Sequence, residues 1–283
     1  MKTQRFAVLG HPVTHSLSPR IHRAFARSLG LAVEYDAIDV PADAFDRKVP
    51  ELINQGWEGF NVTVPHKEHA CRWADHLTGR ARRAGAVNTL LPDPDRPGQW
   101  LGDTTDGAGL LYDLTQVQAL MLESRRILIL GAGGAVRGVI EPLLQAQPLA
   151  IHIANRTPNR AQQLVEQFAE AAHETGTELT GGGYDVAESG WDLVINGTAA
   201  SLSGEVPPLE PSAMQAVGAC YDMMYSAETT PFLAWSEALG VARCMDGLGM
   251  LVGQAAESFM LWTGQRPDVT PVLALLREEL ANG

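Results

Sequence analysis

Apolar and polar residues alternate along the first third of the chain with two different periods. Short apolar stretches typical of strands are separated by segments whose apolar residues recur at three- and four-residue spacing, as on one face of a helix. Strands are expected at residues 6–10, 35–40, 60–64, 86–91 and 100–102. Helices are expected at residues 18–29, 44–53 and 67–77. This alternation predicts an α/β fold with a mostly parallel sheet.

Serine, proline and glycine residues mark the expected ends of these elements. Ser18 is the expected N-cap of the first helix, with Pro19 at its first helical position and Gly30 just after its end. The turn-rich segment 92–98 is expected to join the strands on either side of it as a hairpin.

A second α/β unit begins at residues 126–130, a continuous apolar run that is typical of a strand buried on both faces. A long helix is expected before it, starting at Leu110 and reaching Met121, after a loop at 103–107 that we take as the domain boundary. Further strands are expected at 150–154, 191–195 and 219–223. Further helices are expected at 136–144, 160–172, 230–239, 250–262 and 271–280.

Bulk composition excludes several classes of protein. The formal charge of −12 argues against a nucleic-acid-binding surface, which needs a basic patch. No apolar run is long enough to cross a membrane or to act as a signal peptide, so we expect no membrane partner. The three cysteines are odd in number and widely spaced, which fits neither a disulfide framework nor a metal motif and predicts a reducing compartment.

Lys67 is the residue with the clearest catalytic context. Pro65 ends the strand before it, because proline lacks an N–H group, and Lys67 then falls on the first turn of the next helix. The region beyond the carboxyl end of a strand is where α/β folds place their chemistry. Since the positive end of a helix disfavours a cation, a carboxylate elsewhere in the chain is expected to compensate.

The second unit opens with a glycine-rich turn between a strand and a helix, Gly131-x-Gly133-Gly134-Ala135. Such a turn lets the backbone approach the pyrophosphate of a dinucleotide, which then lies at the helix N-terminus. Val136 occupies the position of the third glycine in the strict motif. A tight turn without any ligand is the alternative interpretation.

The residues after the next strand favour NADP over NAD. An NAD site has an acidic residue there for the ribose hydroxyl, whereas this chain has Asn155, Arg156, Thr157 and Arg160. Two arginines would bind a 2′-phosphate through charge-assisted hydrogen bonds. The alternative is that both are ordinary solvated arginines near a helix start.

Polar residues also gather in the loops that follow strands of the first unit. They are Ser16, Ser18, Thr63, Lys67, Asn88 and Asp106. Hydroxyl, amide, amine and carboxylate groups together suit a small polyhydroxylated acid. No Cys/His cluster has metal-ligand spacing, so no metal is expected. His15 and His66 flank these residues, and we interpret both as loop residues rather than bases.

Seven motifs in order along nearly the whole chain resemble the shikimate dehydrogenase family. They are His15-Ser16-x-Ser18-Pro19, Asn61-Val62-Thr63-Val64-Pro65-x-Lys67, Gly85-Ala86-Val87-Asn88-Thr89, Gly131 to Ala135, Asn155-Arg156-Thr157, Tyr221-Asp222-Met223-x-Tyr225 and Asp246-Gly247-Leu248-Gly249-Met250-Leu251-Val252-x-Gln254. Two departures stand out: Thr104 replaces a usual asparagine, and Gly79 occupies a position where some members carry a glutamate.

The resemblance implies reversible, NADPH-dependent reduction of 3-dehydroshikimate to shikimate, a step of chorismate and aromatic amino-acid biosynthesis in the cytoplasm. It implies a substrate-binding catalytic domain (1–106), an NADP-binding Rossmann domain (107–242) and C-terminal helices (243–283) that return to the first domain. Lys67 and Asp106 correspond to the catalytic pair. The matched substrate positions are Ser16, Ser18, Thr63, Asn88, Tyr225 and Gln254. The matched cofactor positions are Gly131, Ala132, Gly133, Gly134, Ala135, Asn155, Arg156, Thr157, Arg160, Met223 and Gly247.

Other interpretations of the same residues stay open. A quinate/shikimate dehydrogenase would accept an extra ring hydroxyl and often prefers NAD, which the two arginines argue against. A non-catalytic NADP-binding protein has no need for both Lys67 and Asp106. An inert carboxylate-binding module leaves the glycine-rich turn unexplained. The oligomeric state is expected to be a monomer or a homodimer.

Overall fold

The computed structural model of this chain describes residues 2–185 and 189–282. The chain folds into two compact units. The first contains the chain up to Gly109 together with Val252–Leu276, and the second contains Leu110–Leu251 and the chain from Arg277 onward. Residues 243–251, which we expected to belong with the C-terminal helices, lie in the second unit. Within the described ranges, no helix is both long and apolar enough to cross a membrane.

The first unit contains one mixed sheet. Its elements are β1 (Gln4–Gly10), α1 (Ser18–Leu29), β2 (Val33–Asp39), α2 (Phe45–Asn54), β3 (Gly59–Val62), α3 (Lys67–Trp73), β4 (His76–Leu77), α4 (Gly79–Ala84), β5 (Thr89–Pro92) and β6 (Trp100–Asp103). The strand order is β2-β1-β3-β5-β6-β4. The pairs β1–β2, β1–β3 and β4–β6 are parallel, whereas β5 runs antiparallel to β3 and β6, so the predicted hairpin and mostly parallel sheet are confirmed.

Alternate residues of β1 separate the two faces of this sheet. Ala7 and Leu9 face a core with apolar residues of α2 and α3, whereas Phe6 and Val8 face a second cluster that contains Trp262. Trp262 belongs to α9 (Leu248–Thr263) and stacks on Phe6 with ring centroids 4.6 Å apart. Its indole N–H donates to the Leu90 carbonyl at 3.1 Å. The C-terminal part of α9 is thereby fixed against β1 and β5.

Trp262 also explains one glycine of this sheet. A Cβ atom on Gly59 would lie 2.5 Å from the indole nitrogen of Trp262, closer than two such atoms can approach. Gly59 therefore lets the indole ring lie directly on the sheet.

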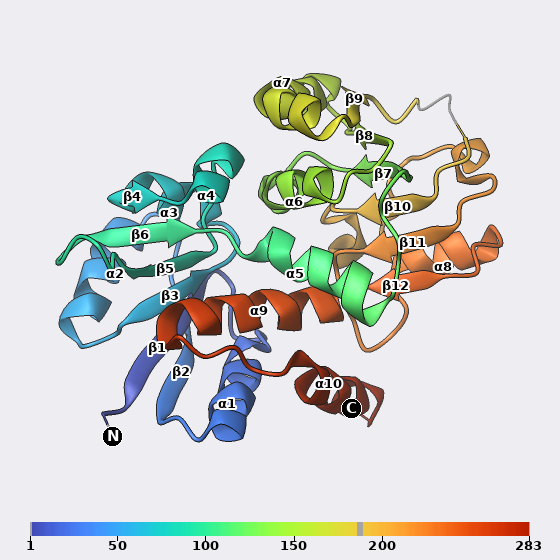
Figure 1. Cartoon of the computed structure of the whole chain (residues 1–283). Coiled ribbons are helices and arrows are strands. Elements are labelled where there is room, and N and C mark those ends of the chain that lie inside the picture. The colour runs from blue at the N-terminus through green and yellow to red at the C-terminus, as the bar shows by residue number, and fades with distance from the viewer. Residues whose placement is uncertain (1, 186–188, 283) are drawn as a thin grey trace. The chain divides into compact units, whose positions relative to one another are not determined.

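The second unit contains a fully parallel sheet. Its strands are β7 (Arg126–Leu130), β8 (Ala150–Ala154), β9 (Glu178–Gly182), β10 (Leu193–Asn196), β11 (Ala219–Asp222) and β12 (Cys244–Asp246). Its helices are α6 (Gly134–Gln145), α7 (Pro158–Thr175) and α8 (Pro231–Ala238), with short 3₁₀ turns at Ala200–Ser203 and Pro211–Met214. The order β12-β11-β10-β7-β8-β9 is that of a Rossmann sheet (Figure 1). The predicted Rossmann-type fold is confirmed.

Both faces of this sheet are covered, as the apolar run in β7 predicts. Ile127 and Ile129 pack in a core with residues of α6 and α7, whereas Leu128 and Leu130 pack with Phe232 of α8. Two adjacent residues of one strand thus point into two different cores, which is why β7 lacks polar residues inside it.

Two expectations about helix ends were wrong. Ser18 is the first residue of α1 rather than its N-cap, which is Leu17. The Ser16 hydroxyl instead accepts a hydrogen bond from the Ser18 N–H at 3.2 Å. The helix after Lys67 ends at Trp73, because the next residue takes an extended conformation, and Leu77 lies in β4.

The long helix expected from Leu110 to Met121 begins and ends four residues earlier and is irregular. It consists of α5 (Asp106–Tyr112) and a π-helical turn (Asp113–Val117). The Asp113 side chain is buried and accepts a hydrogen bond from the Tyr221 hydroxyl at 2.6 Å, which holds the turn against β11. The chain then leaves the helix, with a positive φ of 52° at Ala119. The C-terminal helices are α9 and α10 (Val269–Asn282).

His22 of α1 is a buried titratable group in the first unit. Its ring is 0% exposed and stacks on Tyr35, with centroids 4.1 Å apart and planes at 4°. Neither ring nitrogen has a hydrogen-bond partner of normal geometry among the described residues. Burial lowers the pKa of His22 to about 3, and the nearby Asn61 side chain opposes this only in part.

We predict that His22 makes the first unit less stable in acid. The ring stays neutral in the folded protein down to about pH 3, whereas in the unfolded chain it gains a proton near its ordinary pKa of 6.5. The unfolded state therefore binds more protons over this window, and the free energy of unfolding falls as the pH falls, by at most about 1.4 kcal/mol per pH unit.

Urea unfolding between about pH 6 and pH 4 tests this prediction. His22→Phe keeps a stacking ring without a titrating nitrogen, so its free energy of unfolding should fall less steeply with pH than that of the wild type. Tyr35→Phe keeps His22 and should retain the wild-type slope. Equal slopes for wild type and His22→Phe would contradict the assignment.

Candidate active site

Lys67 and Asp106 form an ion pair in the first unit. Lys67 is the first residue of α3 and Asp106 is the first residue of α5. The Lys67 ammonium donates to Asp106 Oδ2 at 2.6 Å, and the two side chains are only 18% and 9% exposed. The carboxylate that we expected to offset the unfavourable position of a lysine at a helix start is therefore Asp106.

Asn88 holds the second oxygen of Asp106. Its amide nitrogen donates to Asp106 Oδ1 at 2.9 Å, and it also lies 3.2 Å from the side-chain oxygen of Gln254. The backbone N–H of Thr105, which can only donate, lies 2.8 Å from Asn88 Oδ1. A donor at one end and a carboxylate at the other fix the orientation of the amide. Four predicted site residues are thus joined directly.

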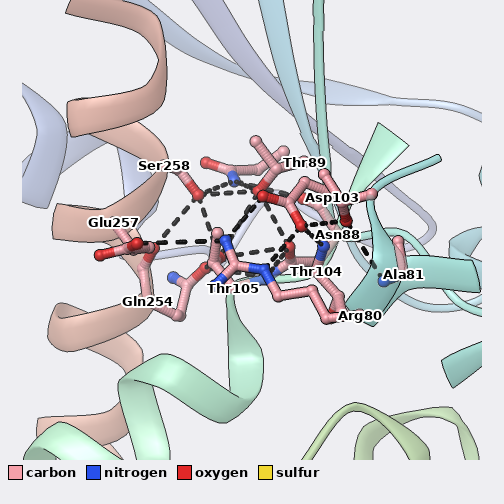
Figure 2. Close-up of polar contacts among 12 residues, drawn as sticks. Arg80, Ala81, Asn88, Thr89, Asp103, Thr104, Thr105, Gln254, Glu257 and Ser258 are labelled. Atoms are coloured by element: carbon pink, nitrogen blue, oxygen red, sulfur yellow. Dashed lines mark hydrogen bonds and ion pairs between the residues drawn. The ribbon is translucent and has the colours of Figure 1, made fainter. Parts of the chain in front are cut away.

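A buried carboxylate supports the loop that precedes Asp106 (Figure 2). Asp103 is 3% exposed at its side chain and accepts from both Nε and a terminal nitrogen of Arg80, at 2.7 and 2.6 Å. The Thr78 hydroxyl and the Thr104 N–H also donate to Asp103, at 2.6 and 2.8 Å. Four donors fix the end of β6, and with it the start of α5. Arg80 lies outside the seven sequence motifs and was not among the predicted site residues.

The remaining expected substrate residues of the first unit lie in loops after β1 and β3. Ser16 and Ser18 stand at the start of α1, and the Ser18 side chain is buried. Thr63 directly follows β3, and its N–H donates to the Leu9 carbonyl at 2.9 Å. His66 is buried and its ring is bonded to the Val40 carbonyl at 2.6 Å, so its interpretation as a structural residue fits these contacts.

In the second unit, the glycine-rich turn joins β7 to α6. Gly131 has a φ of +108°, and a Cβ there would lie 3.2 Å from the Gly197 carbonyl, so glycine is required by the backbone. Cβ atoms on Gly133 or Gly134 would meet no atom of the described residues within 4 Å, apart from chain neighbours and the backbone of α6 itself. None of the described side chains caps α6 at Gly133. Open space in front of uncapped helical N–H groups fits the pyrophosphate of a dinucleotide.

The other expected cofactor residues follow neighbouring strands of the same sheet. Arg156, Thr157 and Arg160 are exposed after β8, and the Asn155 amide donates to the Thr157 carbonyl at 2.9 Å. Because β7, β8, β10, β11 and β12 are parallel, the loops after them lie at one edge of the sheet. Exposed guanidinium groups after β8 are suitably placed for the 2′-phosphate of NADP.

Asp222 fixes the loop that carries Met223 and Tyr225. Its buried carboxylate accepts hydrogen bonds from the hydroxyls of Ser201 and Thr230, at 2.8 and 2.6 Å. The Asn196 amide and the Met224 N–H also donate to Asp222, both at 3.1 Å. Burial raises the pKa of Asp222, and these donors oppose the rise.

Gly247 and Tyr225 also lie after strands of the second sheet. A Cβ on Gly247 would collide with the Met223 carbonyl, so the loops after β11 and β12 can approach only with glycine there. Burial raises the pKa of Tyr225, so its side chain is a neutral hydroxyl at physiological pH.

Sequence comparison assigns the whole chain to one family. The family model of the shikimate dehydrogenase substrate-binding domain matches residues 8–90, that of shikimate/quinate 5-dehydrogenase matches 113–202, and that of the shikimate 5′-dehydrogenase C-terminal domain matches 247–277. The shikimate dehydrogenase (NADP(+)) of Chromohalobacter salexigens is 53% identical over 280 residues, which cover 99% of this chain and 100% of that protein. That of Alkalilimnicola ehrlichii is 48% identical, covering 98% and 100%.

The chain belongs to the shikimate dehydrogenase family. Solved structures of similar proteins have the same fold. Shikimate 5-dehydrogenase from Thermus thermophilus, in complex with NADP(H) and shikimate, superposes with a TM-score of 0.83 and 35% identity, over 97% of this chain and 99% of that one. An Ael1 enzyme from Pseudomonas putida has a TM-score of 0.88 and 38% identity, over 96% and 98%.

Thr104, where this chain departs from the usual asparagine of the shikimate dehydrogenase family, carries a buried hydroxyl. The residue is 3% exposed, and its Oγ1 has no hydrogen-bond partner within the part of the chain that the structure describes. An unsatisfied buried hydroxyl is destabilising, because it has lost its water without gaining a partner.

We therefore predict that Thr104→Val raises the free energy of unfolding by about 1 kcal/mol. Thr230 is a matched control, since it is also 3% exposed but donates to Asp222 at 2.6 Å. Thr230→Val should lower the free energy of unfolding by about 2 kcal/mol. Chemical denaturation of both variants measures the two signs. A loss of stability in Thr104→Val would mean that its hydroxyl is satisfied after all.

Proposed function

We propose that this chain catalyses the reversible, NADPH-dependent reduction of 3-dehydroshikimate to shikimate. The observation that carries the proposal is the cluster of Lys67, Asp106, Asn88 and Gln254, which the fold assembles from distant segments. It supplies one cation, one carboxylate and two amides for a ketone flanked by hydroxyl groups. We assign substrate recognition to residues of the first unit and to Tyr225 of the second, and cofactor binding to the second unit.

Lys67 is the proposed proton donor. When bound, NADPH supplies the hydride that converts the ketone carbon to an alcohol carbon. The ketone oxygen then gains negative charge and needs a proton or a nearby cation, and the Lys67 ammonium can supply either. Only one hydrogen bond of its ammonium, to Asp106, is present among the described residues. Its other N–H groups can therefore point to the substrate.

Asp106 and its neighbours are proposed to orient both Lys67 and the substrate. Asp106 Oδ2 holds the ammonium, and the same carboxylate can accept a hydrogen bond from the hydroxyl next to the ketone. The amides of Asn88 and Gln254 can bind the ring hydroxyls. We propose that Ser16 and Ser18 bind the substrate carboxylate through their hydroxyls, with Thr63 and Tyr225 as further hydroxyl contacts.

The cofactor roles follow the residues at the edge of the Rossmann sheet. Gly131–Ala135 would hold the pyrophosphate, Asn155, Arg156, Thr157 and Arg160 would hold the 2′-phosphate, and Met223 and Gly247 would be further cofactor contacts. We further propose a cytoplasmic enzyme, because Cys71, Cys220 and Cys244 are all free thiols. It would act as a monomer or a homodimer.

Oxidation of quinate is the second candidate activity, since one matched family model covers shikimate and quinate enzymes together. Initial rates with shikimate or quinate, each with NADP or NAD, separate the two. We expect rapid turnover only with shikimate and NADP, because the arginines after β8 favour a 2′-phosphate. Comparable rates with quinate or NAD would favour the broader activity. The absence of turnover in all four reactions would contradict both.

We predict that Lys67→Met lowers kcat by about 100- to 10,000-fold while KM for shikimate changes little, because general acid–base assistance acts on the transition state. Steady-state rates over a range of shikimate concentrations give both constants. Lys48→Met is the matched control, since Lys48 pairs with Glu51 on α2, and it should leave kcat unchanged. A large rise in KM at normal kcat would make Lys67 a binding residue instead.

A further inference from the structure

A buried chain of hydrogen bonds runs through the first unit to Asp106. Its members are Tyr35, Asn61, Ser258, Thr89, Asn88 and Asp106, which are 0%, 5%, 0%, 0%, 3% and 6% exposed. Figure 2 shows the part around Thr89 and Ser258, where α9 meets β5. Ser258 is 169 residues from Thr89 in sequence, yet their hydroxyl oxygens lie 2.8 Å apart. None of the motifs above includes Ser258.

The direction of each bond near Asp106 follows from groups that can only donate or only accept. The Thr105 N–H makes Asn88 Oδ1 an acceptor, at 2.8 Å. The Thr89 hydroxyl, 2.8 Å from the same Oδ1, must therefore donate to it. Since Thr89 has one proton, it must accept the bond that joins it to Ser258. Ser258 is thus the donor to Thr89 at 2.8 Å, and its one proton is shared with the Gln254 carbonyl, which lies 3.1 Å away.

The direction at Asn61 is fixed in the same way. Its amide nitrogen lies 3.2 Å from the Asn88 carbonyl, which can only accept, so this end of the amide donates. The same nitrogen donates to Ser258 Oγ at 2.9 Å, and the Tyr35 hydroxyl donates to the Asn61 oxygen at 2.7 Å. Every bond from Tyr35 to Asn88 therefore points toward Asp106.

Ser258 is the link that α9 contributes to this arrangement. It accepts from Asn61 and donates to Thr89, and α9 holds it in place through the stack of Trp262 on Phe6. If the Ser258 hydroxyl is removed, Thr89 has no donor from α9. The Thr89 hydroxyl can then turn its proton away from Asn88. The Asn88 amide would then lose one of the bonds that orient it toward Asp106. Hydrogen-bond chains in which all donors point one way strengthen one another.

We propose that Ser258 is a positioning residue for the reaction. It acts through Thr89 and Asn88 to hold the Asp106 carboxylate, and so the Lys67 ammonium, in the reactive geometry. This inference rests on the proposed function, because it concerns how fast the ketone is reduced. Small displacements of a catalytic group reduce rates by factors of 10 to 100, so about that loss is expected when the hydroxyl is removed.

The test is the hydride-transfer rate constant in a single turnover, with enzyme in excess over NADPH and with saturating 3-dehydroshikimate. This first-order constant does not depend on how much of the enzyme is folded, so a purely structural role would not lower it. Ser258→Ala should reduce it about 10- to 100-fold. Ser236→Ala is the matched control, because Ser236 is equally buried and donates to the Phe232 carbonyl, just as Ser258 contacts that of Gln254.

A second pair of variants tests the same link if Ser258→Ala does not fold. Thr89→Val keeps the shape of the side chain without the hydroxyl and should show the same loss, whereas Thr89→Ser keeps the hydroxyl and should restore the rate to within about threefold. Constants within twofold of wild type in Ser258→Ala or in Thr89→Val would overturn the proposal, as would an equal loss in Ser236→Ala. An inactive wild type would instead refute the proposed function itself, and this inference with it.

Discussion

Burial of a carboxylate is unfavourable unless its oxygens are hydrogen-bonded, and this constraint governs the first unit. Asp106 meets it with Lys67 on one oxygen and Asn88 on the other. The same pairing lets a lysine stand at the start of α3, where the helix dipole disfavours a cation. The packing of α9 and the bonds to Asp103 hold the segments that carry these groups, so the Lys67–Asp106 pair depends on interactions well outside it.

The second unit is governed by a steric constraint. Its loops must come close to neighbouring backbone groups and, at the proposed cofactor site, to the ligand. Gly131 and Gly247 are required by neighbouring carbonyl groups, whereas Gly133 and Gly134 face open space. Glycines that the protein's own packing does not explain are those expected to approach a pyrophosphate. Asp222 adds rigidity to the adjoining loop through four hydrogen bonds. The proposed pyrophosphate site is thus built largely from backbone.

Sequence patterns predicted this architecture best in the Rossmann sheet. The strands Arg126–Leu130 and Ala150–Ala154 were predicted residue for residue, because each is a short, mostly apolar run. Short or irregular elements such as β4, α4 and the π-helical turn were missed or mistaken, since tertiary contacts decide them. Lys67 and Asp106 were singled out through motifs, and the structure brings the two side chains together. Ser258 could not be, because only its spacing of four residues from Gln254 hints at a shared face.

The central claim is that Lys67 and Asp106 act as one unit, and a double-mutant cycle tests it most directly. The measurement is kcat/KM for shikimate oxidation in Lys67→Met, Asp106→Asn and the double variant. If Asp106 works by holding the ammonium, the double variant should be no more than a few-fold slower than Lys67→Met alone. Losses that multiply in the double variant would show two independent contributions and contradict the account.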